Sequence, residues 1–463
     1  MRFRFINIVV FICLATSGLP LTRAADKSAD DDGSCETKVE NCRCFMAGKN
    51  RPELECTREK LKHIPSASLW PENIFALDVS MNVIKNIDVV DSNDALEYLD
   101  LASNQIESIS PHAFDGLTKL RGLDLSHNEL VAIPSELFNN QLLTLNLSYN
   151  KIEILPKDML KKTTYLQELR IAHNPLRMLE PDLFQYSGQL KSLDLSAIDL
   201  FAIKEDIFHY LFEMSELDLS DNDFMVVPTT PLRSARNLQI LKLNGNPISI
   251  LDEHSFIKMS GLQELYLDDM KELIEIKEKT FSYLYNLRKI SISNNPHLSY
   301  IDNHAFYGIF NRSWMAIQEA NLRANRLSYL ADTTLPFCNL TSLDLRENPW
   351  ACDCHILWAK YCHLRPELTH GIICASPSKF RGDDLMLIDH TEIHCEHSQM
   401  YAEVRLMRLF LIVFVSFTLF FIALVFVLFI KRDVFMKWWS NRRRGTGAIY
   451  YVKAHSNPIE PEF

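Results

Sequence analysis

Apolar and polar residues alternate through the middle of the chain in the pattern LxxLxLxxN, whose x positions are mostly polar. Nine clear copies end at Asn104, Asn128, Asn150, Asn174, Asn222, Asn246, Asn295, Asn325 and Asn348. A looser copy ends at Asn82, and two copies that keep the leucines end at Ile198 and Met270, which makes twelve, spaced 22 to 30 residues apart. The alternation predicts a short strand with one apolar face, which a single repeat cannot bury alone. We therefore predict a stack of coils.

Two further positions of the repeat support this stack. The asparagine stands where the chain leaves the strand, and its amide can bond backbone groups of the turn and of the neighbouring coil. Ile198 and Met270 cannot do this, so we expect local irregularity there. A column of phenylalanines is predicted to form an apolar spine near the convex side: Phe114, Phe138, Phe184, Phe208, Phe256, Phe281 and Phe306.

Cysteine clusters flank the repeats on both sides. Cys35, Cys42, Cys44 and Cys56, followed by LKHIP, precede them, and NPWACDCHILW with Cys352, Cys354, Cys374 and Cys395 follows. These residues resemble the caps of extracellular leucine-rich-repeat proteins, such as Toll-like receptors and neuronal or adhesion leucine-rich-repeat membrane proteins. The resemblance implies an α/β-type solenoid with a curved parallel β-sheet on its concave face and loops or short helical turns on its convex face.

The same resemblance implies disulfides that join the first cysteine of each cap to the third and the second to the fourth. The expected pairs are Cys35 with Cys44, Cys42 with Cys56, Cys352 with Cys374, and Cys354 with Cys395, although the sequence alone allows other connectivities. Cys338 and Cys362 lie outside this scheme, and we hypothesise that they bond to each other. A zinc site around Cys352, Cys354, His355, Cys362, His363 and Cys374 is the alternative, but an oxidising environment favours disulfides.

Both ends of the chain predict export and membrane anchoring. Arg2 and Arg4 precede an apolar run from Phe5 to Ala15, which is typical of a signal peptide and short for the alternative, a first transmembrane helix. Residues 409–430 are uncharged and long enough to cross a bilayer once, and basic residues follow them. We expect a single-pass type I protein of the plasma membrane with an extracellular N-terminal ectodomain.

The expected organisation runs as follows: a signal peptide (1–24), an acidic segment with the N-terminal cap (25–70), about twelve repeats (71–348), the C-terminal cap (349–396), a juxtamembrane segment (397–408), the transmembrane helix (409–430) and a short basic cytoplasmic tail (431–463). The tail contains Trp438, Trp439 and three arginines from Arg442 to Arg444, which suit membrane lipid at the inner leaflet. A plain stop-transfer flank explains the same residues.

Charge and motif content limit the function. The net charge is −11, and removing the tail's +4 and the three arginines of the signal peptide leaves −18 for residues 25–430. An acidic ectodomain argues against nucleic acid as a partner. The sequence lacks GxxxxGK[ST], GxGxxG and HExxH. We therefore expect a protein that is not an enzyme and needs no cofactor.

One outward-facing residue per repeat forms the central column of the predicted concave face. It runs Asp78, Asp100, Asp124, Asn146, Arg170, Asp194, Asp218, Lys242, Tyr266, Ser291, Asn321, Asp344. One hypothesis is an acidic strip that binds a basic patch of a protein ligand through Asp100, Asp124, Asp194 and Asp218, with Tyr98 and Tyr266 as aromatic anchors. The alternative is that LDLS is a frequent form of the repeat.

Three sequons predict N-glycosylation, at Asn146, Asn311 and Asn339. Asn146 belongs to the concave column, so a glycan there would obstruct about the fourth coil. The tail of 33 residues is too short for a kinase or a Toll-type adaptor domain.

Together these features predict a cell-surface recognition or adhesion protein that binds an extracellular or cell-surface protein ligand through its repeats and signals, if at all, through partners such as a co-receptor. One alternative is a co-receptor or accessory subunit of another membrane protein. Another is an immune receptor that lacks its own signalling domain.

Overall fold

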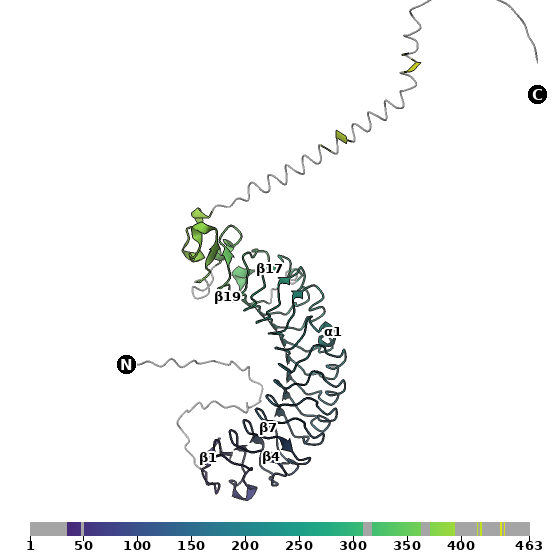
Figure 1. Cartoon of the computed structure of the whole chain (residues 1–463), viewed down its shortest axis with the longest axis vertical. Coiled ribbons are helices and arrows are strands. Elements are labelled where there is room, and N and C mark those ends of the chain that lie inside the picture. The colour runs from purple at the N-terminus through teal and green to yellow at the C-terminus, as the bar shows by residue number, and fades with distance from the viewer. Residues whose placement is uncertain are drawn as a thin grey trace, which may run out of the picture. The chain divides into compact units, whose positions relative to one another are not determined.

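The protein is described by a computed structural model that places residues 35–47, 51–308, 317–362 and 371–393, together with residues 414, 417, 418, 436, 437 and 439. The chain divides into two compact units, Met1–Ile393 and His394–Phe463. The first unit contains all the repeats and both caps as far as they are described. Within it the coils stack into an arc, with the repeat strands along the concave side and turns along the convex side (Figure 1).

The concave side is one sheet of fourteen strands. Their order is β1 (Arg43–Met46), β2 (Pro52–Glu55), β3 (Ala76–Asp78), β5 (Tyr98–Asp100), β7 (Gly122–Asp124), β8 (Thr144–Asn146), β9 (Glu168–Arg170), β10 (Ser192–Asp194), β11 (Glu216–Asp218), β12 (Ile240–Lys242), β14 (Glu264–Tyr266), β16 (Lys289–Ser291), β18 (Glu319–Asn321) and β19 (Ser342–Asp344). The hairpin β1–β2 is antiparallel, and β2 then pairs with β3 in parallel. The cap therefore closes the first edge of the sheet with a strand of its own. Coils 1 to 12 are numbered below from β3 to β19.

Shorter elements fill the remaining sides of the coils and the C-terminal cap. Small sheets are formed by β4 (Asn86–Ile87) with β6 (Ser108–Ile109), by β13 (Ile250–Leu251), β15 (Glu275–Ile276) and β17 (Tyr300–Ile301), and by β20 (Trp350–Ala351) with β21 (Cys374–Ser376). The helices are α1 (Thr229–Leu232) and α2 (Trp358–Tyr361), and the 3-10 turns are η1 (Ala67–Leu69), η2 (Phe337–Asn339), η3 (Ser378–Phe380), η4 (Leu385–Leu387) and η5 (His390–Glu392).

The core is a continuous column of leucines and phenylalanines that passes from coil to coil. Paired strands place repeat leucines directly beside each other, as with Leu99 and Leu123, and both are fully buried. The predicted phenylalanine spine is confirmed, because all seven of its members are buried. Phe281 lies with its ring centroid 5.8 Å from that of Phe256 and 4.5 Å from that of Phe306. Each coil therefore exposes little apolar core once its neighbours are in place.

The asparagine at the end of each repeat joins adjacent coils, as predicted. The Nδ2 of Asn128 donates to the carbonyls of Leu101 and Leu125 at 3.0 Å, and its Oδ1 accepts from the N–H of Ile106 at 3.0 Å. One side chain thus satisfies backbone groups in two coils that would otherwise be buried without partners.

The two repeats without this asparagine remain in register. Strands β9, β10 and β11 pair without a shift through the coil of Ile198, which is buried. The irregularity is limited to the turn, where Asp199 has a positive φ in addition to the positive φ that Ala197 shares with the equivalent residue of the other coils. Asn222 of the next coil compensates, because its Oδ1 accepts from the N–H groups of both Ile198 and Leu200. At the other exception, Met270 is buried and its N–H donates to Asn295 Oδ1 at 2.7 Å.

Four disulfides join cysteines in the pairs expected from the caps and from our hypothesis. They are Cys35–Cys44, Cys42–Cys56, Cys352–Cys374 and Cys338–Cys362. Cys354 is also disulfide-bonded, and its expected partner Cys395 lies outside the described residues. The zinc alternative is wrong for Cys352, Cys362 and Cys374, because their sulfurs are bonded to other sulfurs and cannot act as thiolate ligands.

Several predictions fall on parts of the chain that the structure leaves undescribed. The signal peptide (1–24), most of the transmembrane segment (409–430), nearly all of the tail and the sequon at Asn311 lie outside the described residues. Within the described residues, no helix combines the length and apolar character needed to cross a bilayer.

Candidate recognition surface on the concave face

The structure places the predicted central column at the last residue of every repeat strand and divides it into groups. Asp100 pairs with Asp78 on one side and with Asp124 on the other. Asp194 and Asp218 form a second pair of neighbours, on β10 and β11. Asn146 and Arg170 lie between the two groups. The column is therefore not one uninterrupted acidic strip.

Each aspartate of the column has a backbone role. Its Oδ1 accepts a hydrogen bond from the N–H of the residue two positions later, at 2.8–3.1 Å, and this holds for Asp78, Asp100, Asp124, Asp194, Asp218 and Asp344. Asn146 and Asn321 make the same bond. An Asx turn of this kind ends the strand and directs the chain toward the convex side. The bond favours the interpretation of LDLS as a structural form of the repeat.

The N-terminal aspartates are the least compensated members of the column. Burial raises the pKa of Asp100 to about 7, opposed by its hydrogen bond from Ala102 and reinforced by the charges of Asp124 and Asp78. Asp124 is only 5% exposed and its Oδ2 accepts from Asn146 Nδ2 at 3.0 Å. Asp124 therefore contributes negative charge to this surface but almost no area that a ligand could contact.

Tyr98, one of the two predicted anchors, lies beside these aspartates and depends on a glycine. A Cβ added at Gly122 would lie 2.5 Å from Tyr98 Cδ1, so the ring occupies the space that a side chain would need. Tyr98 also packs against Phe75 with ring centroids 5.1 Å apart, and Arg51 lies over the Phe75 ring at 4.6 Å. The first two coils thus present the partly exposed ring of Tyr98, packed on the buried ring of Phe75, next to the raised-pKa carboxyl of Asp100.

A ladder of three rings follows on the next three coils. His127, Tyr149 and His173 stack with centroids 4.1 Å apart and interplanar angles of 10° and 16°. All three have positive φ and are exposed at the turn after the strand. They belong to SHN, SYN and AHN, directly before the repeat asparagine. This group was not predicted from the sequence, although the shared position of three rings directly before the repeat asparagine was a usable signal.

The second acidic pair is partly balanced by a lysine of the next coil. Lys242 Nζ lies 2.9 Å from Glu216 Oε1 and 3.5 Å from Asp218 Oδ2. Burial works to lower the pKa of Lys242, but the hydrogen bonds and charges of Glu216 and Asp218 raise it. For Asp194, burial raises the pKa even though two hydrogen bonds from Ser196 oppose it. This group offers less net charge to a ligand than the aspartate count suggests.

Tyr266, the other predicted anchor, is also engaged locally. Its hydroxyl donates to Glu264 Oε2 at 2.6 Å, and Lys289 Nζ lies 5.2 Å from its ring centroid. Burial, followed by the hydrogen bond to Glu264, raises the pKa of Tyr266. The ring remains half-buried between these charged neighbours, so a ligand would have to displace Lys289 to stack on it.

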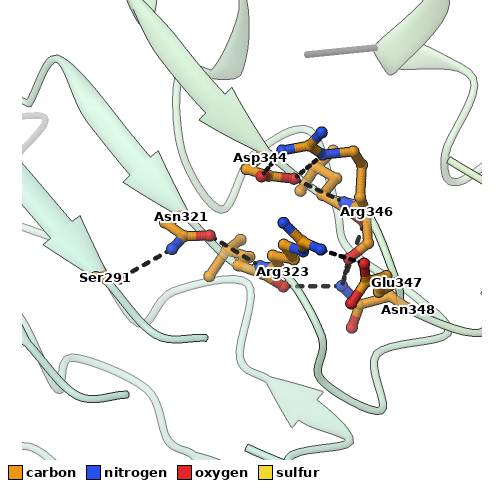
Figure 2. A network of polar contacts seen from close by, with 9 residues as sticks. Ser291, Asn321, Arg323, Asp344, Arg346, Glu347 and Asn348 are labelled. Atoms are coloured by element: carbon orange, nitrogen blue, oxygen red, sulfur yellow. Dashed lines mark hydrogen bonds and ion pairs between the residues drawn. The ribbon is translucent and has the colours of Figure 1, made fainter. Parts of the chain in front are cut away.

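At the C-terminal end of the column, arginines pair with the acidic groups (Figure 2). Arg346 Nε donates to Asp344 Oδ1 at 2.9 Å, and Arg323 pairs with Glu347. Partial burial favours a higher pKa for Asp344, but the hydrogen bonds and charge of Arg346 hold it below its usual value. Asp344 therefore stays ionised while its charge is balanced.

The two described sequons differ in accessibility. Asn146 lies in β8, and its amide donates to Asp124 Oδ2 while its Oδ1 accepts from the N–H of Ser148. Asn339 is exposed at the end of η2. A glycan at Asn339 would leave the concave hydrogen bonds intact, whereas one at Asn146 would compete with them.

The described residues include no group of three or more histidine, cysteine or acidic side chains placed to hold a metal ion. What the concave face offers is a long, solvent-open array of carboxylates, rings and paired charges. Such a surface acts by complementarity with a partner.

Comparison with known proteins agrees with the repeat and the caps. The leucine-rich-repeat family model matches residues 72–130, 119–176 and 212–271. The matched residues of this chain are therefore leucine-rich repeats. The matched ranges include the repeat strands from β3 to β9 and from β11 to β14, which form part of the continuous sheet described above.

Two extracellular repeat proteins are similar to shorter segments of the chain. Tsukushi of Gallus gallus is 32% identical over 112 residues, which is 24% of this chain and 29% of that protein. Chondroadherin of Rattus norvegicus is 34% identical over 93 residues, 19% of this chain and 23% of that protein. The matches thus span less than a third of either relative.

A solved structure shares the fold of the repeats. The Drosophila complex of Toll with Spatzle contains a chain that matches 70% of this protein and 55% of its own length, with a TM-score of 0.50 and 22% identity. At this identity the likeness shows a shared curved solenoid of parallel strands and does not identify a binding surface.

Proposed function

We propose that this leucine-rich-repeat protein is a cell-surface recognition or adhesion protein that binds a protein ligand on its concave face. The main support is the continuous sheet, in which twelve repeat strands pair in register and present their outward residues on one open surface. Repeat solenoids use such concave surfaces for binding. The uncharged segment 409–430 supports anchoring at the plasma membrane.

Within that surface, we place the ligand on coils 1 to 5. The central and C-terminal charges are balanced internally by Lys242, Arg323 and Arg346. The N-terminal coils hold three aspartates on adjacent strands, with Tyr98 and the exposed ladder of His127, Tyr149 and His173 beside them. Carboxylates next to aromatic faces suit lysine and arginine side chains, through ion pairs and cation–π contacts. The proposed ligand therefore presents a basic segment.

The raised pKa of Asp100 predicts that ligand binding depends on pH. A cationic side chain beside Asp100 favours its ionised form, so binding should release a proton near neutral pH. Affinity for a basic segment should therefore rise between pH 6 and pH 8, the range around the pKa of about 7. A binding mode that does not involve Asp100 would lack this dependence.

The test uses cells that display the full chain and a labelled peptide of alternating lysine, arginine and serine as the probe. The variant replaces Asp78, Asp100 and Asp124 by asparagine, which keeps the Asx bond that Asn146 and Asn321 already make. We expect binding to fall about tenfold or more, a change of about 1.4 kcal/mol, and its rise between pH 6 and pH 8 to disappear.

Asp344→Asn serves as the matched control, because it occupies the same column position with a charge that Arg346 already balances. It should bind the peptide as the wild type does. Equal loss in both variants, or no loss in the triple variant, would contradict placement of the ligand on coils 1 to 5. Adhesion of the displaying cells to each other and to unmodified cells then tells whether the cellular ligand is this chain or another protein.

A further inference from the structure

Nine large apolar side chains are exposed on one lateral side of the solenoid, in eight consecutive coils. This lateral apolar strip consists of Val131, Ile154, Met178, Phe201, Met225, Val226, Ile250, Ile274 and Tyr300, which are 41–76% exposed. The side lies between the concave strands and the convex turns, because each of these residues follows the repeat asparagine or its replacement by a few positions.

Backbone pairing places the members of the strip at neighbouring positions of successive coils, although the residue paired directly with a member is not always a member itself. Ile154 forms a bridge with Ala132 of the coil before it, and Ile250 pairs with Glu275, which pairs in turn with Tyr300. In the middle of the strip, the N–H of Asp223, two residues before Met225, donates at 2.8 Å to the carbonyl of Leu200, the residue before Phe201. Each member is flanked by residues that point into the core, as Ile152 and Leu155 flank Ile154. The strip is thus a regular feature of the stack.

The strip differs from the same side of the first two coils. There the equivalent positions are Lys85, Asn86, Glu107 and Ser108, and Lys85 Nζ lies 4.0 Å from Glu107 Oε1. From coil 3 to coil 10, only three of the sixteen equivalent positions are charged: Glu153, Arg177 and Glu275. Because lateral positions are open to water, polar residues are expected at them, and their replacement over eight coils needs a reason.

The exposed area is that of a protein interface. At these exposed fractions, each side chain leaves on the order of 100 Å² of apolar surface in water. Nine of them offer roughly 900 Å², whereas the largest apolar patch of a typical monomer is about 300–600 Å² and a standard interface buries about 800 Å² per partner. One copy of the strip would therefore suffice for one side of a stable dimer.

Charge determines which partner suits the strip. Residues 25–430 have a net charge of −18, so two copies repel each other over most of their surface. The lateral apolar strip is a long region almost without charge, where two copies can approach closely. A two-fold dimer brings the same patch of each copy together, and a mainly apolar patch with few charges is complementary to itself.

We infer that the lateral apolar strip is a self-association surface, through which two copies of this chain form a dimer and leave their concave faces free. This surface is separate from the one proposed for the ligand. An experiment that disproves the dimer would therefore not disprove the proposed ligand surface, because peptide binding is measured on the concave face.

The test uses the full chain with two different epitope tags, expressed together in one cell and captured through one tag. The wild type should co-capture the second tag. A variant that carries Phe201→Asp and Met225→Asp should lose co-capture about tenfold or more, because two carboxylates per copy would meet in the middle of the interface. Both side chains are at least 70% exposed, so their replacement leaves the core intact.

Two controls separate loss of the interface from loss of folding. Leu387→Asp changes a residue of the C-terminal cap that is 78% exposed and outside the strip, and it should co-capture like the wild type. A chain with Phe201→Lys and Met225→Lys, expressed with the aspartate variant, should recover co-capture to within about threefold of the wild type, because opposite charges then face each other.

Recovery by opposite charges would support the dimer, since misfolded variants cannot restore each other. Three results would overturn it: a wild type that does not co-capture itself, an aspartate variant that co-captures as well as the wild type, or a lysine and aspartate pair that reaches the cell surface without recovering co-capture.

Discussion

The two ends of the concave column hold the same residue type in the same backbone position, yet in different electrostatic environments. Asp100 and Asp344 both end a repeat strand and both accept a hydrogen bond from the N–H two residues later. Asp100 lies between two further aspartates, and its pKa rises to about 7. Asp344 is paired with Arg346, and its pKa falls below the usual value. In a repeat protein, neighbours in the adjacent coil therefore decide what a shared side chain contributes.

The largest expected effect of this difference is on stability at Asp100. Its folded-state pKa lies above the unfolded value of 3.8, so the native state holds the proton more tightly. The stabilisation is complete below about pH 4 and is lost as the pH rises toward 7. Asp100→Asn removes the charge and keeps the Asx bond, so it should stabilise the protein by about 2–4 kcal/mol at pH 8.

Urea unfolding of the full chain at pH 5 and pH 8, followed by tryptophan fluorescence, would measure this effect. The difference between wild type and Asp100→Asn should be larger at pH 8 than at pH 5. A difference that is the same at both pH values would mean that Asp100 is ionised at its ordinary pKa, and the contrast with Asp344 would disappear.

A smaller effect is expected from Gly122→Ala, which tests the role of Tyr98 at the N-terminal end of the column. The new Cβ would lie 2.5 Å from Tyr98 Cδ1 and 3.1 Å from Thr144 Oγ1, so the tyrosine ring must move. We expect a loss of about 1 kcal/mol in the free energy of unfolding, because the Tyr98 ring is only half-buried and can shift away from the new methyl group. Binding of the basic peptide should weaken as well, if Tyr98 is an anchor.

Gly188→Ala is a suitable comparison, since its added Cβ would meet its nearest atom, Phe212 Cδ2, only at 3.4 Å. That variant should keep both stability and peptide binding. Unfolding midpoints and peptide titrations on both variants would distinguish a displaced Tyr98 from a general effect of alanine.

The smallest effect is expected at the other end, from Asp344→Asn. This change breaks the pair with Arg346 but keeps the Asx bond, so the free energy of unfolding should fall by less than about 1 kcal/mol, as for other partly exposed ion pairs. Its sign is opposite to that of Asp100→Asn. Stabilisation by Asp344→Asn at pH 8 would show that Arg346 does not balance the carboxylate.

Much of the fold could be predicted because repeats contact only their neighbours. The leucine spacing indicated the twelve coils, the phenylalanine column indicated the buried spine, and the cysteine clusters resembled caps. The role of the repeat asparagine also followed from its position, since every coil needs the same backbone groups satisfied. These features depend on the pattern within one repeat and on its recurrence.

The candidate site was predicted less completely. The aspartate column was found, but the sequence did not separate the compensated Asp218 and Asp344 from the uncompensated Asp100. The ring ladder of His127, Tyr149 and His173 was missed because its members are 22 and 24 residues apart and look unrelated along the chain. The lateral apolar strip escaped notice for the same reason.

The sequence by itself determined the repeat unit, the number of coils and the residues that fill the core, because apolar periodicity and backbone hydrogen bonding act within each coil. Only the tertiary structure decided which carboxylates are neutralised, which rings stack and which apolar side chains stay in water. Those outcomes depend on side chains of adjacent coils about 4.8 Å apart across the sheet, where charge, stacking and exposure are set by pairs that the linear sequence separates by more than twenty residues.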